Sequence, residues 1–369
     1  AMSLGLSAIG GILFLGGGST VTIAQRMFEG MNSFALLAIP LYTFAGFTMS
    51  KGGISKRLMD FCYSIVGHIY GGLAHVNVLS SMIFAGISGS AVADTAGASG
   101  MFMPEMIRKG YSKNFTVAVT AISSTIGIII PPSIPMVVIA GICGISTGKL
   151  FLGGIIPGIL CGLAQMIVSY FLAKKEGVPK EPGHFTIGPV LHGLWESWPA
   201  LLMPIIIVGT ITMGIVSPTE AGVIAVVYGL FAGGIIYREL KWEDIKFAFA
   251  ETVRTSGRIF IVIGAAKLYT VMLTTAGFDK WVAKTMLGFS TNPTVILIMI
   301  LLIFFIVTMF MESIATLTLF MPILYPIALG VGINPIVLSV LITVVIGIGL
   351  VTPPVGMCIY VACDLMDTT

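Results

Sequence analysis

Long apolar runs separated by short polar stretches dominate the pattern of this chain. The longest run without a charged residue or a histidine extends from Ser313 to Cys363. A helix needs about 20 residues to cross the hydrocarbon core of a bilayer, so this run is long enough for at least two passes. Its prolines and glycines predict that those passes are interrupted. The pattern therefore predicts an all-α polytopic membrane protein.

Membrane-length segments alternate with polar ones along the rest of the chain. The segments of membrane length are 4–20, 33–49, 58–75, 115–145, 150–173, 198–216, 220–237, 257–276 and 294–311. Charged residues, prolines and glycines between 176 and 197 predict a linker. The charged stretch 238–256 predicts an amphipathic helix at the membrane interface.

Composition supports the same class of protein. Hydrophobic residues make up 56% of the chain and charged residues only 9%, whereas a soluble domain has about 25% charged residues. So few charges cannot cover a water-facing surface, but a bilayer accepts an apolar exterior. The net charge of +3 gives no reason to expect nucleic acid as a partner. The five cysteines lie in apolar stretches, where we expect them to pack as small residues.

An internal repeat organises the chain. The same marks occur in the same order in both halves, namely an acidic residue, a Phe-Met-Pro triplet and a Pro-Pro dipeptide: Asp94, Phe102–Pro104 and Pro131–Pro132, then Glu312, Phe320–Pro322 and Pro353–Pro354. This divides the chain into a first repeat at 1–175, the linker at 176–197 and a second repeat at 198–369. Repeats with helix breakers at matching positions are typical of secondary transporters.

The stretch from Gly86 to Asp94 is the first candidate site. Its small residues suit the tight turn of a hairpin tip, and Ser88 and Ser90 offer oxygen atoms to a cation. An ionised carboxylate facing lipid costs about 2.5–3.5 kcal/mol, so Asp94 is expected to face the protein interior. The structural alternative is that these residues pack closely and that Asp94 caps a helix.

The first Pro-Pro dipeptide is the second candidate. Pro131 and Pro132 have no N–H, so carbonyls upstream of them, beginning at Gly127, lose their helical partners. At membrane depth those carbonyls need other partners. A cation is the functional interpretation, and a neighbouring helix or water is the structural one.

The second half offers hydroxyls at the matching places. Thr316 and Thr318 follow Glu312, and Thr352 lies between Gly349 and the second Pro-Pro dipeptide. A threonine on its own often bonds the backbone of its own helix. The position of these residues in the repeat favours a second cation site.

Two other charges fall in apolar surroundings. Lys267 lies near mid-bilayer depth, where it could hold a substrate carboxylate, pair with an acid or extend to the interface. Glu220 lies where a helix begins, and a capping role is favoured there.

An enzyme and a channel are the alternatives from other classes. The G-x-S-G pattern at Gly86–Gly89 also surrounds the nucleophile of intramembrane serine proteases, but such a protease needs an embedded histidine as its base. The only histidines after Ser90 are His184 and His192, near the polar linker. A channel can also contain hairpins and Pro-Pro breaks, but it requires flux without ion coupling.

The motifs together resemble those of the large membrane subunit of tripartite ATP-independent periplasmic (TRAP) transporters, the DctM-like proteins. The residues that carry the resemblance are Ser33–Pro40, Gly67–Leu73, Ser88–Thr95, Ile130–Pro135, Pro218–Ala221 and Leu350–Gly356. The resemblance implies an elevator-type carrier, in which a transport domain moves against a scaffold. That domain would contain re-entrant hairpins at about 77–109 and 296–328 and unwound helices at about 115–145 and 335–363.

The resemblance also implies sodium-driven uptake of an organic anion, such as a C4-dicarboxylate or sialic acid, across the bacterial inner membrane. The implied partners are a small four-helix membrane subunit and a periplasmic substrate-binding protein. The implied sodium ligands are Ser88, Ser90, Asp94, Gly127 and Pro131 in the first half and Thr316, Gly349 and Thr352 in the second. The implied substrate contacts are Ser133, Thr318, Pro354 and Lys267.

The sequence departs from the family pattern in two respects. The family usually has a longer first helix and a further apolar helix after 363, so we expect this sequence to be part of a longer chain. Lys267 stands where a small or apolar residue is expected. A carrier of the same superfamily that works without a binding protein is the nearest alternative.

Overall fold

The computed structural model describes residues 2–14, 20–178 and 185–366. All regular elements in these ranges are helical, which confirms the predicted all-α class. Six helical segments of this part of the chain are long and apolar enough to cross a membrane. They include α9 (Thr147–Lys175), α10 (Ile187–Thr212) and α12 (Trp242–Thr275).

Two pairs of consecutive helices meet at short turns. We call α5 (Gly72–Ser88) and α6 (Ala91–Arg108) hairpin one, and Gly89 and Ser90 join them. Hairpin two is α14 (Pro293–Thr308) and α15 (Ser313–Gly330). These helices overlap the ranges 77–109 and 296–328 that the family resemblance implies.

Two other helices are interrupted at the Pro-Pro dipeptides. The first consists of α7 (Lys113–Ser124), the 3-10 turn η2 (Thr125–Ile128) and α8 (Ile134–Cys143). The second consists of α16 (Pro335–Gly349) and α17 (Met357–Asp364). The helices break where proline removes the N–H that the next turn needs. The peptide bond between the two prolines is cis in both halves.

The broken helices connect the two halves of the chain. After its break, the first broken helix continues as α8, which packs against α15 of hairpin two. After its break, the second continues as α17, which packs against α6 and α7. Hairpins and broken helices therefore form one interlocked group.

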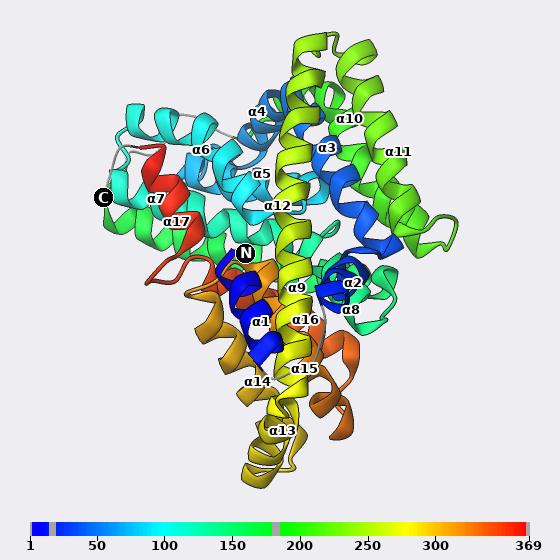
Figure 1. Cartoon of the computed structure of the whole chain (residues 1–369). Helices are drawn as coiled ribbons and strands as arrows, with labels where there is room; N and C mark the ends of the chain where they lie inside the picture. The colour runs from blue at the N-terminus through cyan, green and yellow to red at the C-terminus, as the bar shows by residue number, and fades with distance from the viewer. Residues whose placement is uncertain (1, 15–19, 179–184, 367–369) are drawn as a thin grey trace.

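A second group of helices lies beside this one. Its members are α1 (Met2–Phe14), α2 (Thr20–Met31), η1 (Phe34–Leu37), α3 (Ala38–Lys51), α4 (Ile54–Val66), α10, α11 (Pro218–Phe231), η3 (Ala232–Ile236), α12 and α13 (Phe278–Phe289). Figure 1 shows α12 running through the height of the molecule, with α4 near its first turns and α13 at its other end. Because α4 precedes hairpin one and α13 precedes hairpin two, the chain enters the two hairpins near opposite ends of α12.

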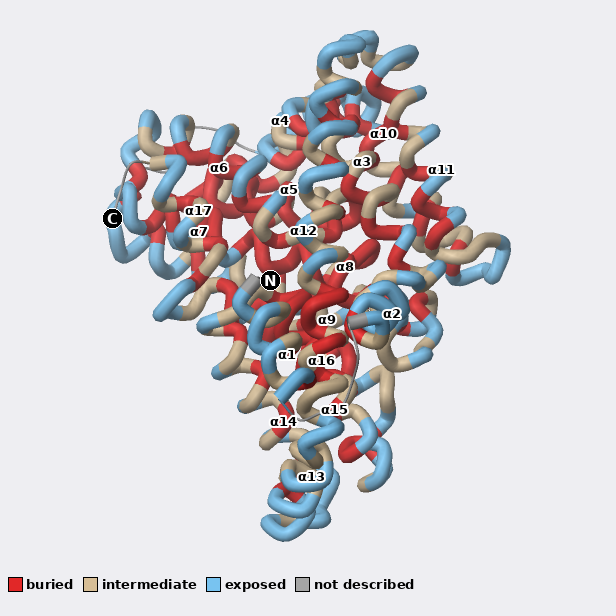
Figure 2. Tube along the Cα trace, viewed as in Figure 1, coloured by how far each residue is buried: buried red, intermediate tan, exposed pale blue. Residues whose placement is uncertain are grey.

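Burial is concentrated where the helices meet, and the outer surface stays apolar. Figure 2 shows buried segments through the middle of the molecule and exposed ones at the tip formed by α13. On α9, Ile156 is 69% exposed and Phe171 is 63% exposed. Lipid can cover such side chains, whereas a water-soluble monomer rarely exposes so many of them together.

The predicted end of the linker is wrong. The linker does not extend to 197, because α10 already begins at Ile187. Pro189 falls in the first turn of α10, where its missing N–H breaks no helical bond. Residues 179–184 of the predicted linker, including His184, lie outside the described residues.

The stretch 238–256 is not a separate interfacial helix. Most of it belongs to α12, which continues without interruption from Trp242 to Thr275. This part of α12 contains no proline, and its charges are accommodated along the helix surface, where Arg254 pairs with Glu251 at 2.6 Å. Charge alone therefore did not end the helix.

The segment 58–75 is not a single span. Gly67 ends α4, and Gly71, with a φ of 72°, precedes α5. Short helices, α4 and α13, lead into the two hairpins, and the sequence analysis did not predict either of them as a separate element.

Candidate functional site

The tip of hairpin one is seated on the first helix break. Gly89 has a φ of 64°, a left-handed conformation that glycine adopts readily, and Ser90 caps α6 by accepting a hydrogen bond from the Ala93 N–H at 3.4 Å. The Gly89 carbonyl accepts from the N–H of Ile134, the first residue of α8, at 3.1 Å. A Cβ atom on Gly89 would lie 2.7 Å from the Pro132 carbonyl oxygen, so only glycine allows this close approach.

Asp94 lies in the first turn of α6, directly behind this tip. Its side chain is buried, and its Oδ1 accepts a hydrogen bond from the Ser88 hydroxyl. The Ser88 hydroxyl oxygen in turn accepts from the Ser90 N–H at 3.3 Å. The other carboxylate oxygen, Oδ2, is buried and has no hydrogen-bond partner in the described part of the chain. A buried carboxylate oxygen without a donor is costly, so its position points to a ligand.

Gly127 provides the surface on which the Asp94 carboxylate lies. A Cβ atom on Gly127 would overlap Asp94 Oδ2 and would lie 3.0 Å from Asp94 Cγ and 3.6 Å from the Ser90 carbonyl carbon. Pro131 has no N–H, so the Gly127 carbonyl lacks its helical donor. The Ile128 carbonyl loses its donor to Pro132 in the same way, but it accepts from the Ser133 hydroxyl at 2.5 Å.

The first break therefore brings hairpin one against the broken helix, with Gly127 beside the Asp94 carboxylate and the Ser90 backbone. The oxygens that these residues offer are the unpaired Asp94 Oδ2, the hydroxyl oxygens of Ser88 and Ser90 and the backbone carbonyl of Gly127. Carboxylate, hydroxyl and carbonyl oxygens suit a hard cation, and carbonyls of unwound helices coordinate sodium in transporters. The residues present fit a sodium ion.

Hairpin two is seated on the second break in the same manner. The Met309 carbonyl accepts from the Val355 N–H, just after the second Pro-Pro dipeptide, at 3.1 Å. A Cβ atom on Gly349 would overlap the Thr308 hydroxyl oxygen. Gly349 precedes its Pro-Pro dipeptide at the same spacing as Gly127. Each half therefore presses a glycine of a broken helix against the tip of a hairpin.

The carboxylate of the second half is fully engaged. Glu312 caps α15, with its Oε2 accepting from the N–H groups of Ile314 and Ala315 at 3.0 and 3.2 Å. Its Oε1 accepts from the Ser313 hydroxyl at 2.7 Å. The repeat predicts that Asp94 and Glu312 are equivalent, but only Asp94 keeps an oxygen without a donor.

The oxygens around the second break are also engaged. The hydroxyls of Thr316, Thr318 and Thr352 donate to their own helix backbone, at Glu312, Ile314 and Ile348, over 3.1, 2.7 and 2.6 Å. The Gly349 carbonyl accepts from the Thr352 N–H at 3.1 Å, and the Leu350 carbonyl from the Cys358 N–H at 3.0 Å. The hydroxyls of Ser88 and Ser90 are hydrogen-bonded as well, so the difference between the two breaks lies in the carboxylates. The first break is the better candidate for a cation because Asp94 Oδ2 is buried there without a donor, whereas both oxygens of Glu312 have one.

The remaining candidates lie in different surroundings. Ser133 is buried, donates to Ile128 and caps α8, so its hydroxyl is used by the fold. Pro354 is exposed at the second break. The stem of Lys267 packs against α2, because a Cβ atom on Gly30 would lie 2.7 Å from Lys267 Cβ. Glu220 forms a capping box with Ser217, which confirms its predicted capping role.

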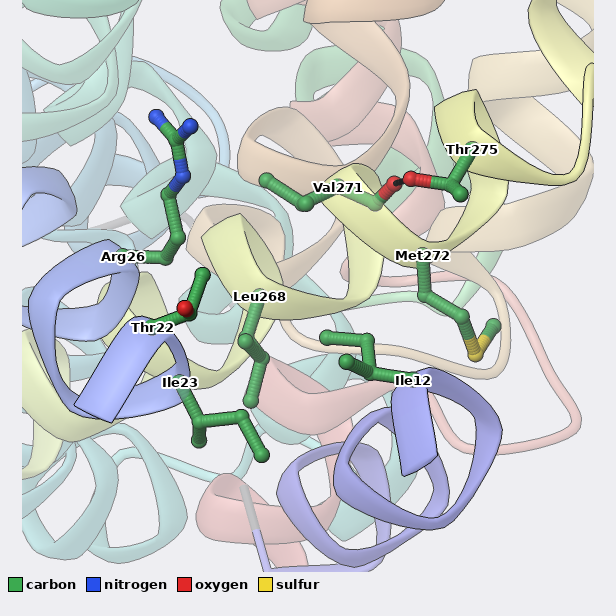
Figure 3. A pocket seen from close by; sticks show the side chains of 8 residues that line it. All are labelled: Ile12, Thr22, Ile23, Arg26, Leu268, Val271, Met272 and Thr275. Carbon is green, nitrogen blue, oxygen red and sulfur yellow. Dashed lines mark hydrogen bonds between the residues drawn. The ribbon is translucent and has the colours of Figure 1, made fainter. Parts of the chain in front are cut away.

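A small pocket lies elsewhere, between α1, α2 and α12 (Figure 3). Its lining is mainly apolar, with Ile12, Ile23 and Leu268 on its wall and Arg26 at its edge. None of the residues of the two hairpin tips lines it. It is therefore separate from the candidate cation site.

The sequence analysis missed Thr308 and Ile134. Thr308 precedes Glu312 at the same spacing as Ser90 precedes Asp94, so the repeat contained the signal. Ile134 contributes only a backbone N–H, which no side-chain pattern reveals.

Comparison with known proteins gives the family. Residues 1–368 match the family described as "Tripartite ATP-independent periplasmic transporter, DctM component". The chain belongs to this DctM family. The resemblance seen in the motifs is thereby confirmed, and the match extends over almost the whole chain.

Three curated relatives show how closely the DctM chain matches. It is 37% identical to the sialic acid TRAP transporter large permease protein SiaM of Vibrio cholerae, over 93% of this chain and 80% of that protein. It is 36% identical to the C4-dicarboxylate TRAP transporter large permease protein DctM of Pseudomonas aeruginosa, over 97% and 84%. It is 38% identical to the isethionate TRAP transporter permease protein DctMQ of Oleidesulfovibrio alaskensis, of which it spans 57%.

Two solved structures share the fold. The YdaH transporter of Alcanivorax borkumensis has a TM-score of 0.60 at 14% identity, covering 94% of this chain and 81% of that one. MtrF of Neisseria gonorrhoeae, from a class of antimetabolite efflux pumps, has a TM-score of 0.60 at 14% identity and is covered over 78%. The role rests on the family and on the curated relatives, which are transporter permeases: the DctM chain is a membrane transport protein rather than an enzyme, and the protease alternative is excluded.

Proposed function

We propose that this DctM chain is the carrier subunit for sodium-coupled uptake of an organic anion. The observation that carries the proposal is the unpaired, buried Asp94 Oδ2, which lies against Gly127 where a helix has lost its donors. A sodium ion there would be held by both hairpin one and the first broken helix. Its binding would fix the hairpin tip on the break.

The two groups of helices suggest how transport proceeds. The interlocked hairpins and broken helices would move together as the transport domain, against a scaffold that includes α3, α10, α11 and α12. The anion would bind between the two hairpin tips once sodium has ordered them. The membrane potential contributes about 2.3 kcal/mol per net charge per 100 mV. It therefore favours uptake when the sodium ions moved in one cycle carry more charge than the anion.

The substrate class and partners rest on the family. The named relatives transport sialic acid, C4-dicarboxylates and isethionate, which are all organic anions. The tripartite, periplasmic description of the family supports a small membrane subunit and a periplasmic substrate-binding protein as partners. The bacterial relatives support placement in the inner membrane.

The distribution of basic residues supports one orientation. Two hydrogen bonds show which helix ends lie on the same side. The Tyr237 hydroxyl, just after η3, donates to the Glu196 carbonyl in the first half of α10 at 2.8 Å. Ser112, just before α7, donates to Glu176, just after α9, at 2.7 Å. The opposite connections have Arg26, Lys149, Lys280 and Lys284. The basic residues at the ends of the helices on this side are more numerous: Lys51, Lys56, Arg57, Arg108, Lys109, Lys113, Lys174, Lys175, Arg238, Lys241 and Lys246. Short cytoplasmic loops carry the excess of basic residues. Hairpin one would then enter from the cytoplasm and hairpin two from outside.

Thiol labelling tests this orientation. In a background without the native cysteines, an impermeant reagent added to cells with a permeabilised outer membrane is expected to label Lys280→Cys but not Lys109→Cys. Disruption of the inner membrane is the control and should expose both. Labelling of Lys109→Cys alone in intact cells would reverse the orientation.

Reconstitution tests the function. In vesicles that contain this chain with its small subunit, uptake from a panel of organic anions is expected only with the cognate binding protein outside and an inward sodium gradient. Uptake without the binding protein would favour the independent carrier. Flux that ignores the sodium gradient would favour a channel and contradict the proposal.

A further inference from the structure

We propose that Asn77 is a positioning residue for the cation site, because its buried amide fixes hairpin one against the first broken helix. This inference rests on the proposed function, since it concerns how the sodium ligands of that site are held in place. Asn77 lies in α5 and is completely buried. Its side-chain hydrogen bonds go to Met106, Thr120 and Ser123, and none of these is a proposed ligand.

The Asn77 amide uses both of its ends across a helix interface. Its Nδ2 donates to the Thr120 hydroxyl of α7 at 2.8 Å, and its Oδ1 accepts from the Ser123 hydroxyl at 3.0 Å. Ser81, one turn further along α5, donates to the Ser123 hydroxyl at 3.2 Å. All four side chains are buried, so these hydrogen bonds have no competition from water.

The network joins the two elements that form the cation site. α5 leads to Ser88 and, through the tip, to Asp94. α7 continues through η2 to Gly127. A slide or rotation of α5 against α7 would change the separation between the Asp94 carboxylate and the Gly127 carbonyl. Apolar packing resists separation but specifies position weakly, whereas an amide bonded at both ends specifies it strongly.

In the described part of the second half, the corresponding helices show no such side-chain hydrogen bonds between hairpin two and the second broken helix. Thr308 of α14, Thr318 of α15 and Thr343 of α16 each donate to the backbone of their own helix. Hydrogen bonds between side chains of the hairpin and of the broken helix thus occur at the break where Asp94 Oδ2 has no donor. This is the arrangement expected if the network serves the site rather than the fold in general.

The substitution Asn77→Leu tests the proposal, because leucine keeps the branching and the number of side-chain heavy atoms but has neither a donor nor an acceptor. Thr120 keeps its bond to the Thr116 carbonyl at 2.9 Å, and Ser123 keeps its bond to the Thr120 carbonyl at 3.1 Å, so neither hydroxyl is left without a partner. The sodium concentration for half-maximal uptake is expected to rise about 10- to 100-fold, as when groups that orient metal ligands are removed. The maximal rate at saturating sodium is expected to stay near that of the unchanged complex.

The matched control is Thr343→Val, which removes a buried hydroxyl that bonds only its own helix. It is expected to leave the sodium dependence unchanged. If Asn77→Leu does not fold, Ser123→Ala removes the donor to Asn77 Oδ1 and is expected to shift the sodium dependence in the same direction. The rise in melting temperature on adding sodium to the purified complex provides a second readout, which both network variants should reduce.

Asp94→Asn, measured in parallel, separates the two proposals. If Asp94→Asn removes sodium dependence but Asn77→Leu and Ser123→Ala leave it unchanged, the positioning role is wrong and the cation site stands. If Asp94→Asn transports with normal sodium dependence, the proposed site itself is wrong. A lower melting temperature with an unchanged sodium response would show that the network serves stability only.

Discussion

Asp94→Asn is expected to reduce sodium-dependent uptake by about 100-fold or more, the scale found when one partner of a buried charge interaction is removed. Asparagine keeps the shape of the side chain and can still accept from Ser88 through its oxygen. It replaces Oδ2, the one oxygen of the tip that is buried without a donor, by an NH2 group that repels a cation. The measurement is the initial rate of anion uptake by the reconstituted complex as a function of sodium.

Glu105→Gln is the matched control for this variant. Glu105 lies on the same helix as Asp94 and pairs with the exposed Arg108 at 2.5 Å. Pairs at the surface contribute about 0–1 kcal/mol, so sodium-dependent uptake should be unchanged. Uptake by Asp94→Asn with the sodium dependence of the unchanged protein would remove the central support for the proposed site.

Gly127→Ala is the second substitution with a large expected effect. The added methyl group would occupy the space of Asp94 Oδ2 and would lie 3.0 Å from Asp94 Cγ. Either the carboxylate or the broken helix must move, and overpacking of this kind costs about 1–3 kcal/mol. We expect a loss of sodium affinity of about 10- to 100-fold, measured as the sodium concentration for half-maximal uptake.

Gly100→Ala is the control for Gly127→Ala, because it adds the same methyl group to a helix of hairpin one at a position with free space. Gly100 lies on α6 of the same hairpin, and no heavy atom lies within 4 Å of a Cβ atom built there. Its uptake and sodium dependence should be unaffected. Equal effects of Gly100→Ala and Gly127→Ala would mean that the close approach of Gly127 to Asp94 has no functional role.

The second hairpin tip can be probed in the same way. Gly349→Ala would bring a methyl group into the Thr308 hydroxyl, but no unpaired carboxylate oxygen lies there. Comparison with Gly127→Ala therefore separates a general requirement for tight hairpin seating from a requirement for the Asp94 site. A sodium effect confined to Gly127→Ala would support one carboxylate-based site in the first half.

The sequence alone determined the features that follow from covalent chemistry and composition. Apolar runs with few charges required a membrane protein, since only lipid accepts such an exterior. The helices break at Pro131–Pro132 and Pro353–Pro354 because proline has no N–H in any environment. The repeated order of acidic residue, Phe-Met-Pro and Pro-Pro indicated two related halves, and the family comparison agrees with the transporter class that this suggested.

Only the tertiary structure decided which atoms meet. The tip at Gly89 reaches Ile134, and Asp94 lies on Gly127, because packing brings together segments that are distant in sequence. The same packing gave the equivalent acids Asp94 and Glu312 different partners, turned Lys267 toward α2, and made the charged stretch after 241 part of α12. A hydrogen bond forms only where a donor and an acceptor come within roughly 3.5 Å, and the sequence pattern does not fix that distance.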